Sequence, residues 1–141
     1  MKLEHWVNLA KYCMMFNENM VYILGNGVKV INTTPHSITF LESDGETITI
    51  VPECGFILNA NPVEVEIESQ IEGVKFVKTV FEATKEGNEF INSIPSDVLV
   101  VSSLLAAQAY PGKAVALTPF PGYERKPIPE KRMNTDKFTV F

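Results

Sequence analysis

The stretch from Asp97 to Arg125 constrains the fold of this chain more than any other. It begins with an apolar run, Val98–Val101, whose length and composition are typical of a strand buried on both faces. Ser102 and Ser103 follow directly and offer an N-cap for a helix over 104–108, which a Pro-Gly pair ends. We therefore expect a buried strand that passes straight into a short helix.

This junction between strand and helix is also a candidate binding site. The unpaired N–H groups and the positive dipole end of a helix start point at one spot. The only two arginines of the chain, Arg125 and Arg132, lie downstream. Together with Ser102 and Ser103, these residues favour a small anionic or nucleotide-like ligand. The same residues also describe a core strand and a core helix with an ordinary cap, which needs no ligand.

Three aromatic side chains lie close to this junction in the sequence: Tyr110, Phe120 and Tyr123. One interpretation is that they form a flat surface on which a base stacks. The other is that they pack against the core of the domain, as aromatic rings commonly do.

Most of the remaining chain has the pattern of strands. Turn residues separate short apolar or alternating runs, which is typical of hairpins. We expect one hairpin over 20–31 around Gly25-Asn26-Gly27, one over 38–51 around Ser43-Asp44-Gly45-Glu46, and one over 60–81. In the third hairpin, Val63, Val65 and Ile67 should share one face and Glu64, Glu66 and Glu68 the other, with Lys75 and Lys78 able to face the glutamates.

The two ends of the chain are unusually apolar. Leu3–Phe16 has the spacing of an amphipathic helix, and its wide apolar face suits either packing on its own sheet or a dimer contact. At the other end, Phe138, Val140 and Phe141 should dock as a last strand or across a partner. The fold class that we expect is α+β: a mostly antiparallel sheet with an N-terminal helix and one short helix after a buried strand.

The length of 141 residues indicates a single domain. We expect an N-terminal helix over 1–19, a β-rich body over 20–120 and a basic C-terminal arm over 121–141. The net charge of −5 argues against a general DNA-binding protein. Twelve acids and three lysines lie between positions 37 and 100, whereas positions 121–141 hold five bases and three acids. This asymmetry suggests docking of the tail within or between subunits, or collection of an anion.

The sequence offers few residues for catalysis or metal binding. His36 and Asp44 suit general acid–base work on a nucleotide or phosphoester, but a lone histidine beside a proline turn also suits a structural role. Two cysteines, Cys13 and Cys54, form no metal set, and we expect them to be reduced. No apolar run is long enough for a membrane span. We expect a cytosolic, non-enzymatic protein without metal, cofactor or membrane partner.

Several motifs resemble a group of small proteins of bacteriophages, prophages and actinobacteria. They are Asn32-x-x-Pro35-His36-x-Ile38-Thr39, a proline and glycine over 52–55, and Leu99-Val100-Val101-Ser102 before an alanine-rich helix. The resemblance covers roughly residues 30–125. The layout also resembles the first class of Thoeris anti-defence sponge proteins, which are non-enzymatic oligomers that bind cyclic ADP-ribose isomers made by TIR-domain immune enzymes.

This resemblance implies a function and a set of site residues. The implied function is to sequester a cyclic nucleotide signal in the cytoplasm of an infected bacterial host, as a dimer or higher oligomer. By residue type, Arg125 and Arg132 would hold phosphate, Gln108 would supply an amide, and Tyr110, Phe120 or Tyr123 would stack on the base. The alternative is a phage structural or host-interaction protein that binds a protein partner.

Overall fold

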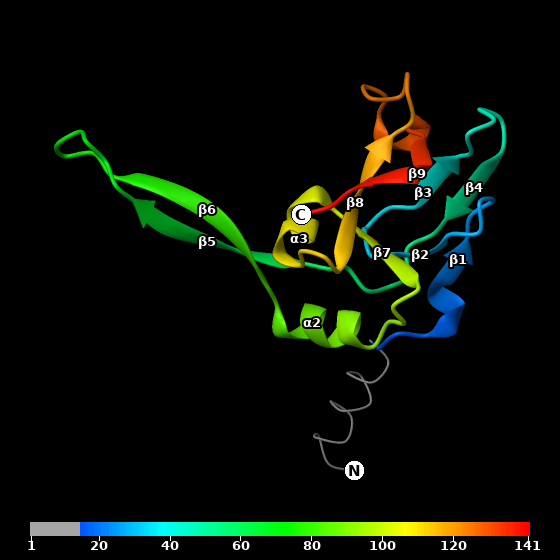
Figure 1. The fold of residues 1–141 in the computed structure, drawn as a ribbon, viewed down its shortest axis with the longest axis horizontal. Coiled ribbons are helices and arrows are strands. Elements are labelled where there is room, and N and C mark those ends of the chain that lie inside the picture. Colours follow the sequence, from blue (N-terminus) through cyan, green and yellow to red (C-terminus); the bar gives the residue numbers. More distant parts are fainter. Residues whose placement is uncertain (1–14) are drawn as a thin grey trace, which may run out of the picture.

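The computed structural model describes residues 15–141. The helix expected over Leu3–Phe16 therefore lies outside the described residues, apart from Met15 and Phe16, which are in no helix. The described chain is mixed α and β and mostly strand (Figure 1). Its elements are η1 (Glu18–Met20), β1 (Val21–Ile23), β2 (Lys29–Asn32), β3 (Ile38–Leu41), β4 (Ile48–Val51), β5 (Ala60–Ile67), β6 (Phe76–Ala83), α2 (Lys85–Asn92), β7 (Val98–Ser102), α3 (Leu104–Ala109), β8 (Ala114–Pro119), η2 (Ile128–Glu130) and β9 (Met133–Thr139).

All three expected hairpins are present. β1 pairs with β2, β3 with β4, and β5 with β6, each antiparallel. The first turn relies on Gly27, whose φ of 87° is a left-handed conformation that side chains with a Cβ rarely adopt. In the second turn the Asp44 carboxylate accepts hydrogen bonds from the N–H groups of Glu46 and Thr47 at 2.8 and 2.9 Å. Local turn chemistry is thus sufficient to place the first two of these pairs.

The expectation of a mostly antiparallel sheet is wrong. The seven-stranded sheet has the order β1-β2-β7-β8-β9-β3-β4, and its pairs β2·β7, β7·β8 and β3·β9 are parallel. For β7 and β8 the physical reason is the connection through α3, which carries the chain back along the sheet so that β8 runs in the same direction as β7. The sheet curls into a nearly closed barrel, in which Asn32 at the end of β2 bonds to Val51 at the end of β4 and to Cys54 just beyond it.

The apolar run of β7 is buried on both faces, as its sequence predicts. Val101 belongs to a core cluster inside the curled sheet, with residues such as Val30 and Phe40. Its neighbour Val100 belongs to a second cluster on the outer face, which includes Phe90 of α2. Adjacent strand residues point to opposite faces, so a strand between two cores must be apolar throughout.

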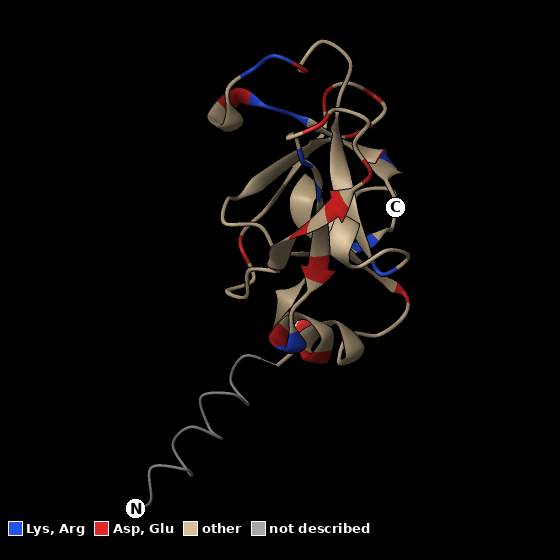
Figure 2. Ribbon diagram, turned by 90° about the vertical axis from the view of Figure 1, so that its left-hand side faces the viewer, with Lys and Arg blue, Asp and Glu red and all other residues tan. Residues whose placement is uncertain are grey.

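The C-terminal segment 121–141 divides into two parts. Residues 121–132 form a loop that contains η2, and Figure 2 shows its basic residues at one end of the molecule. β9 then enters the sheet between β8 and β3, where Phe138 lies 6.4 Å from Phe40 between ring centroids. Docking of Phe138 as part of a last strand is confirmed, whereas Val140 and Phe141 remain exposed. The basic arm expected over 121–141 is therefore part of the body from Met133 onward.

β5 and β6 form an arm that projects from the body (Figure 1). We call residues 60–83 the arm. Its register differs from the expected one: Lys78 lies opposite Val65, whereas Glu64 and Glu66 lie opposite Thr79 and Val77. Directly opposed residues share a face, so Lys78 faces the valine side and not the glutamates. The separation of the strands by a loop of eight residues, 68–75, sets this register, and that loop has no signature in the alternating pattern.

No helix among residues 15–141 is long and apolar enough to cross a membrane.

Candidate functional site

The loop after β2 is held by a buried asparagine. Asn32 is 1% exposed, and its amide nitrogen donates to the carbonyl oxygens of His36 at 2.7 Å and Val51 at 3.1 Å. Its amide oxygen accepts from the backbone N–H of Thr34 at 2.9 Å and from the Thr34 hydroxyl at 2.6 Å. The two donors and two lone pairs of the amide are therefore all used within the protein. This network closes the turn Asn32–His36 and fixes its shape.

The end of β7 lies beside this loop. The Thr33 hydroxyl donates to the carbonyl oxygen of Val101 at 2.7 Å, and the Thr33 N–H donates to the same oxygen at 2.9 Å. Ser102 follows and is 1% exposed. Ser103 is the N-cap of α3, since its hydroxyl accepts from the N–H of Ala106 at 3.2 Å. The strand, the cap and the short helix thus form as the sequence predicts.

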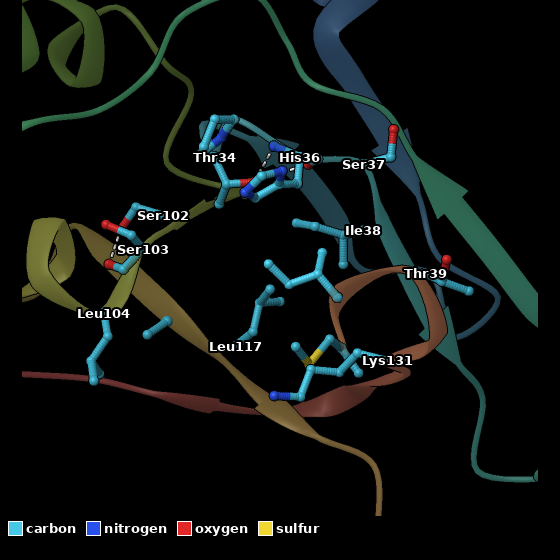
Figure 3. Close-up of a pocket in the computed structure, with 14 residues that line it drawn as sticks. Thr34, His36, Ser37, Ile38, Thr39, Ser102, Ser103, Leu104, Leu117 and Lys131 are labelled. Atoms are coloured by element: carbon cyan, nitrogen blue, oxygen red, sulfur yellow. Dashed lines mark hydrogen bonds between the residues drawn. The ribbon is translucent and has the colours of Figure 1, made fainter. Parts of the chain in front are cut away.

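A cavity of about 330 Å³ opens where the carboxyl ends of the parallel strands β2 and β7 meet. Figure 3 shows Thr34 and His36 on one side, Ser102, Ser103 and Leu104 on another, and Lys131 across from them. Ile38 and Leu117 lie between these groups. The size falls within the range of small-molecule sites, and the carboxyl ends of parallel strands are a common place for them.

The cavity combines an apolar wall with a polar rim. Its apolar side chains come from β3, α3, β8, β9 and η2: Ile38, Leu104, Ala116, Leu117, Met133 and Ile128. Its polar groups are hydroxyls, the imidazole of His36 and the ammonium group of Lys131. Such a lining suits a small ligand with an apolar or aromatic body and one anionic group, because Lys131 supplies a single positive charge.

Two of the residues expected in a binding site line the cavity, namely Ser102 and Ser103. The two arginines do not line it. Arg125 is exposed, and Arg132 donates from its guanidinium group to the carbonyl oxygen of Lys131 at 3.3 Å. The cation at the cavity is their neighbour Lys131, because the loop over 121–132 turns this residue toward Leu117 and Met133.

The expected aromatic surface is not assembled at the cavity. Tyr110 is 2% exposed and belongs to the outer core cluster. Its hydroxyl donates to the Asn59 carbonyl at 2.8 Å and accepts from the N–H of Thr84 at 3.0 Å, so its ring is unavailable for stacking. Phe120 and Tyr123 lie outside the cavity lining and contact each other edge to face, with ring centroids 6.3 Å apart.

The remaining expected ligand residue, Gln108, lies on α3 outside the cavity lining. Its side-chain amide donates to the carbonyl oxygen of Leu104, one helical turn earlier, at 3.3 Å. This bond within the helix directs the amide along α3.

Residues considered for acid–base chemistry are separated by the fold. His36 lines the cavity, but Asp44 caps the β3–β4 turn, where a hydrogen bond from the Thr47 hydroxyl lowers the pKa of its carboxyl. Cys54 also lies outside the cavity lining, and burial raises the pKa of its thiol. Among residues 15–141, no three His, Cys, Asp or Glu side chains gather in a group able to hold a metal ion.

Sequence reasoning missed most of the cavity lining. Ile38 and Thr39 belong to the motif that carries the resemblance, so the motif itself was the available signal. Lys131 and Met133 had no local signal, because they reach the cavity only when β9 pairs with β3 and β8.

Three comparisons with known proteins were made for the whole chain. No protein-family model matches it, and neither the curated proteins nor the solved structures show significant similarity to it.

Proposed function

We propose that this protein is a non-catalytic binding protein for a small organic anion with a flat or apolar body, of the nucleotide-signal class. The observation that carries the proposal is the cavity beside α3, in which hydroxyl groups and one ammonium group surround an apolar wall. In this proposal a base or another ring packs against the apolar wall, and the hydroxyl groups form hydrogen bonds with the polar edge of the ring. The ammonium group of Lys131 binds one phosphate. A binding role requires affinity without turnover, and a rigid loop favours affinity.

The rigidity of the cavity comes from Asn32. Because the amide of this residue ties together the backbone at Thr34, His36 and Val51, one side of the cavity is ordered before any ligand arrives. A preformed wall lowers the entropy lost on binding, which supports tight sequestration of a scarce signal.

The biological setting of the proposal rests on the sequence resemblance alone. On that ground we propose that the protein acts in the cytoplasm of an infected bacterium, where it sequesters a cyclic ADP-ribose-type or another cyclic nucleotide immune signal. Arg125 and Arg132 lie outside the cavity lining, so in this proposal Lys131 takes the phosphate-binding role that the resemblance assigns to arginine.

The proposal is tested with the purified full chain. Denaturation and filtration should release an ultraviolet-absorbing nucleotide if the ligand copurifies. Calorimetry with cyclic ADP-ribose isomers, and with ADP-ribose and AMP as further probes, should give saturable binding. Absence of a released nucleotide, together with absence of binding by every probe at high micromolar concentration, would overturn the proposal.

The positive charge at the cavity provides a matched pair of variants. Lys131→Ala should weaken binding by roughly 1.5–3 kcal/mol, the usual worth of a hydrogen bond to a charged group. Lys137→Ala removes an equal charge from an exposed position on β9 and should leave the affinity unchanged, since this residue lies outside the cavity lining. Equal losses for both variants would show that only net charge matters and would contradict a specific site.

A second candidate function is favoured by the arm. A projecting hairpin with several exposed apolar side chains suits a structural or host-interaction protein that binds another protein. The two candidates differ in their tests. Binding of a protein partner through the arm should be lost in the arm variants described below and kept in Lys131→Ala.

A further inference from the structure

The arm has the composition of an interaction surface. Val65, Ile67 and Phe76 are exposed to 44%, 45% and 41%, and they lie on one face of the β5–β6 ladder. β5 and β6 pair only with each other among residues 15–141, so each strand keeps an open edge. Open edges with exposed apolar side chains favour contact with another chain.

The arm is also acidic and lacks cations opposite its central glutamates. Residues 60–83 carry five glutamates and two lysines, a net charge of −3. The opposed residues of Glu64 and Glu66 are Thr79 and Val77, so neither glutamate has a cross-strand lysine. These charges repel a second arm, and they therefore select an occupant with a positive surface.

One segment of the molecule has the complementary charge. Residues 125–132, which we call the basic segment, carry four bases and one acid, a net charge of +3. The segment also exposes an apolar side chain, Ile128, at 59%. The ion pair found among residues 15–141 joins Lys29 to Asp97, so neither the arm nor the basic segment forms an ion pair within these residues.

The arm and the basic segment of one molecule extend in different directions. Figure 1 shows the arm extending to the left of the sheet, whereas the segment between β8 and β9 lies at the top of the molecule. In Figure 2, where the arm points toward the viewer, the basic segment lies at the top of the molecule. The two complementary surfaces can therefore meet only between molecules.

We propose that the arm docks on the basic segment of a second copy of this chain. Glu64 and Glu66 face Arg125 and Lys126 of the other copy, and the apolar side chains of the arm cover Ile128. Two copies that exchange arms in this way form a closed two-fold dimer, the commonest symmetry of soluble oligomers. The inference stands on the arm and does not require a bound ligand, although Ile128 and Lys131 of the basic segment also line the cavity.

The assembly is measured on the full chain by light scattering after size exclusion and by sedimentation velocity. At 50 mM salt the protein should form a dimer at micromolar concentration. Because the contact pairs exposed charges, raising the salt to 500 mM should increase the dissociation constant at least tenfold. A monomer at every concentration up to 0.1 mM at low salt would overturn the proposal.

Charge reversal identifies the two surfaces. The variant Glu64→Lys/Glu66→Lys and the variant Arg125→Glu/Lys126→Glu should each raise the dissociation constant at least tenfold. All four residues are exposed, so both variants should keep the fold of the wild type, as checked by circular dichroism. The matched control Glu46→Lys/Glu53→Lys reverses two exposed acids outside the arm and should dimerise like the wild type.

Mixing the two reversed variants provides the decisive test. Each variant alone places like charges at the contact, whereas the mixture pairs every reversed arm with a reversed basic segment. The equimolar mixture should regain the wild-type dissociation constant within about threefold. An assembly that survives both reversals, or a mixture that stays monomeric, would overturn the proposal and assign the contact to another face.

Discussion

At the scale of single residues, Asn32 holds the loop beside the cavity through its side-chain hydrogen bonds. It is buried, and its amide nitrogen satisfies two backbone carbonyl groups that come from different parts of the chain, His36 and Val51. A buried carbonyl without a partner costs about 1–3 kcal/mol, which exceeds the net gain from an ordinary hydrogen bond. The residue therefore stabilises both the loop and the closure of the curled sheet.

We predict that Asn32→Ala lowers the free energy of unfolding by about 2–4 kcal/mol, because the Val51 carbonyl and the Thr34 N–H lose their bond to this side chain, whereas the His36 carbonyl keeps the Thr34 hydroxyl as a donor. Urea denaturation followed by circular dichroism measures the change. Asn61→Ala, an exposed position on β5, serves as the control and should change stability by less than about 0.5 kcal/mol. Similar small changes for both variants would show that water replaces the donor and that the network is not important.

At the scale of elements, α2 depends on the absence of a side chain at Gly87. A Cβ at this position would overlap the hydroxyl oxygen of Tyr110 and lie 2.7 Å from the ring carbon that carries it. The Tyr110 hydroxyl is held by Asn59 and Thr84, so the ring has no free direction in which to move.

Gly87→Ala therefore sets two effects against each other. The higher helix propensity of alanine favours the variant by about 1 kcal/mol. Overpacking against a fixed ring costs about 1–3 kcal/mol, so we predict net destabilisation. Asn88→Ala, at the exposed neighbouring position of the same helix, gains propensity without a clash and should be neutral or slightly stabilising in thermal unfolding. A more stable Gly87→Ala would show that α2 can shift away from Tyr110.

The β3–β4 hairpin has a pH dependence that follows from its turn. The Thr47 hydroxyl and the backbone N–H groups of Thr47 and Glu46 donate to the Asp44 carboxylate, and these bonds lower the pKa of Asp44 in the folded protein. Since the folded pKa is the lower one, this stabilisation is present above the ordinary value of about 3.9. It is lost as the pH falls through the folded pKa.

We predict that Thr47→Val moves the pKa of Asp44 upward, because the hydroxyl makes the largest contribution to the shift. A nuclear magnetic resonance titration that follows the side-chain carboxyl carbon of Asp44 measures this directly. Thr47→Ser keeps the hydroxyl and should keep the lowered pKa. An unchanged pKa in Thr47→Val would assign the shift to the backbone N–H groups alone.

At the scale of the whole molecule, β9 holds the two halves of the sheet together. It lies between β8 and β3, with Phe138 opposite Leu117 and Met133 opposite Phe40. Its side chains add long-range bonds, such as that from the Asn134 amide to the carbonyl oxygen of Pro119 at 3.0 Å. Loss of this strand would leave two unpaired strand edges inside the sheet.

We predict that a chain ending at residue 132 loses cooperative unfolding, because β8 and β3 have no other connection at this position in the strand order. A chain ending at Thr139 removes only the exposed Val140 and Phe141 and should keep the fold. Thermal melts by circular dichroism and the dispersion of amide resonances compare the two. A cooperative transition in the shorter chain would show that β8 and β3 can pair directly.

Several local features were predictable from the sequence because their causes lie within a few residues. The glycine and aspartate turns set the hairpins, the run at Val98–Val101 indicated a strand between two cores, and Ser103 marked the start of α3. Ser102 and Ser103 were also predicted at the site, since a strand that passes into a helix places its cap at the end of the strand.

The alternating pattern of β5, by contrast, did not determine its register against β6. The sequence of β6 does not alternate strictly, so it does not show which of its faces meets the glutamate face of β5, and the connecting loop sets the register. The same limit applies to Tyr110, because nothing in the sequence around it distinguishes a buried ring held by distant backbone from an exposed ring.

The sequence by itself determined the three hairpins, the buried strand β7 with the short helix α3 after it, and the division of its charges into an acidic body and a basic end. The tertiary structure alone decided that β9 lies inside the sheet, that three strand pairs are parallel, and that Lys131 and not an arginine reaches the cavity. The physical reason is distance along the chain. Backbone preferences and periodicity act between neighbours, whereas strand order and the meeting of side chains at a cavity depend on contacts between residues far apart in sequence.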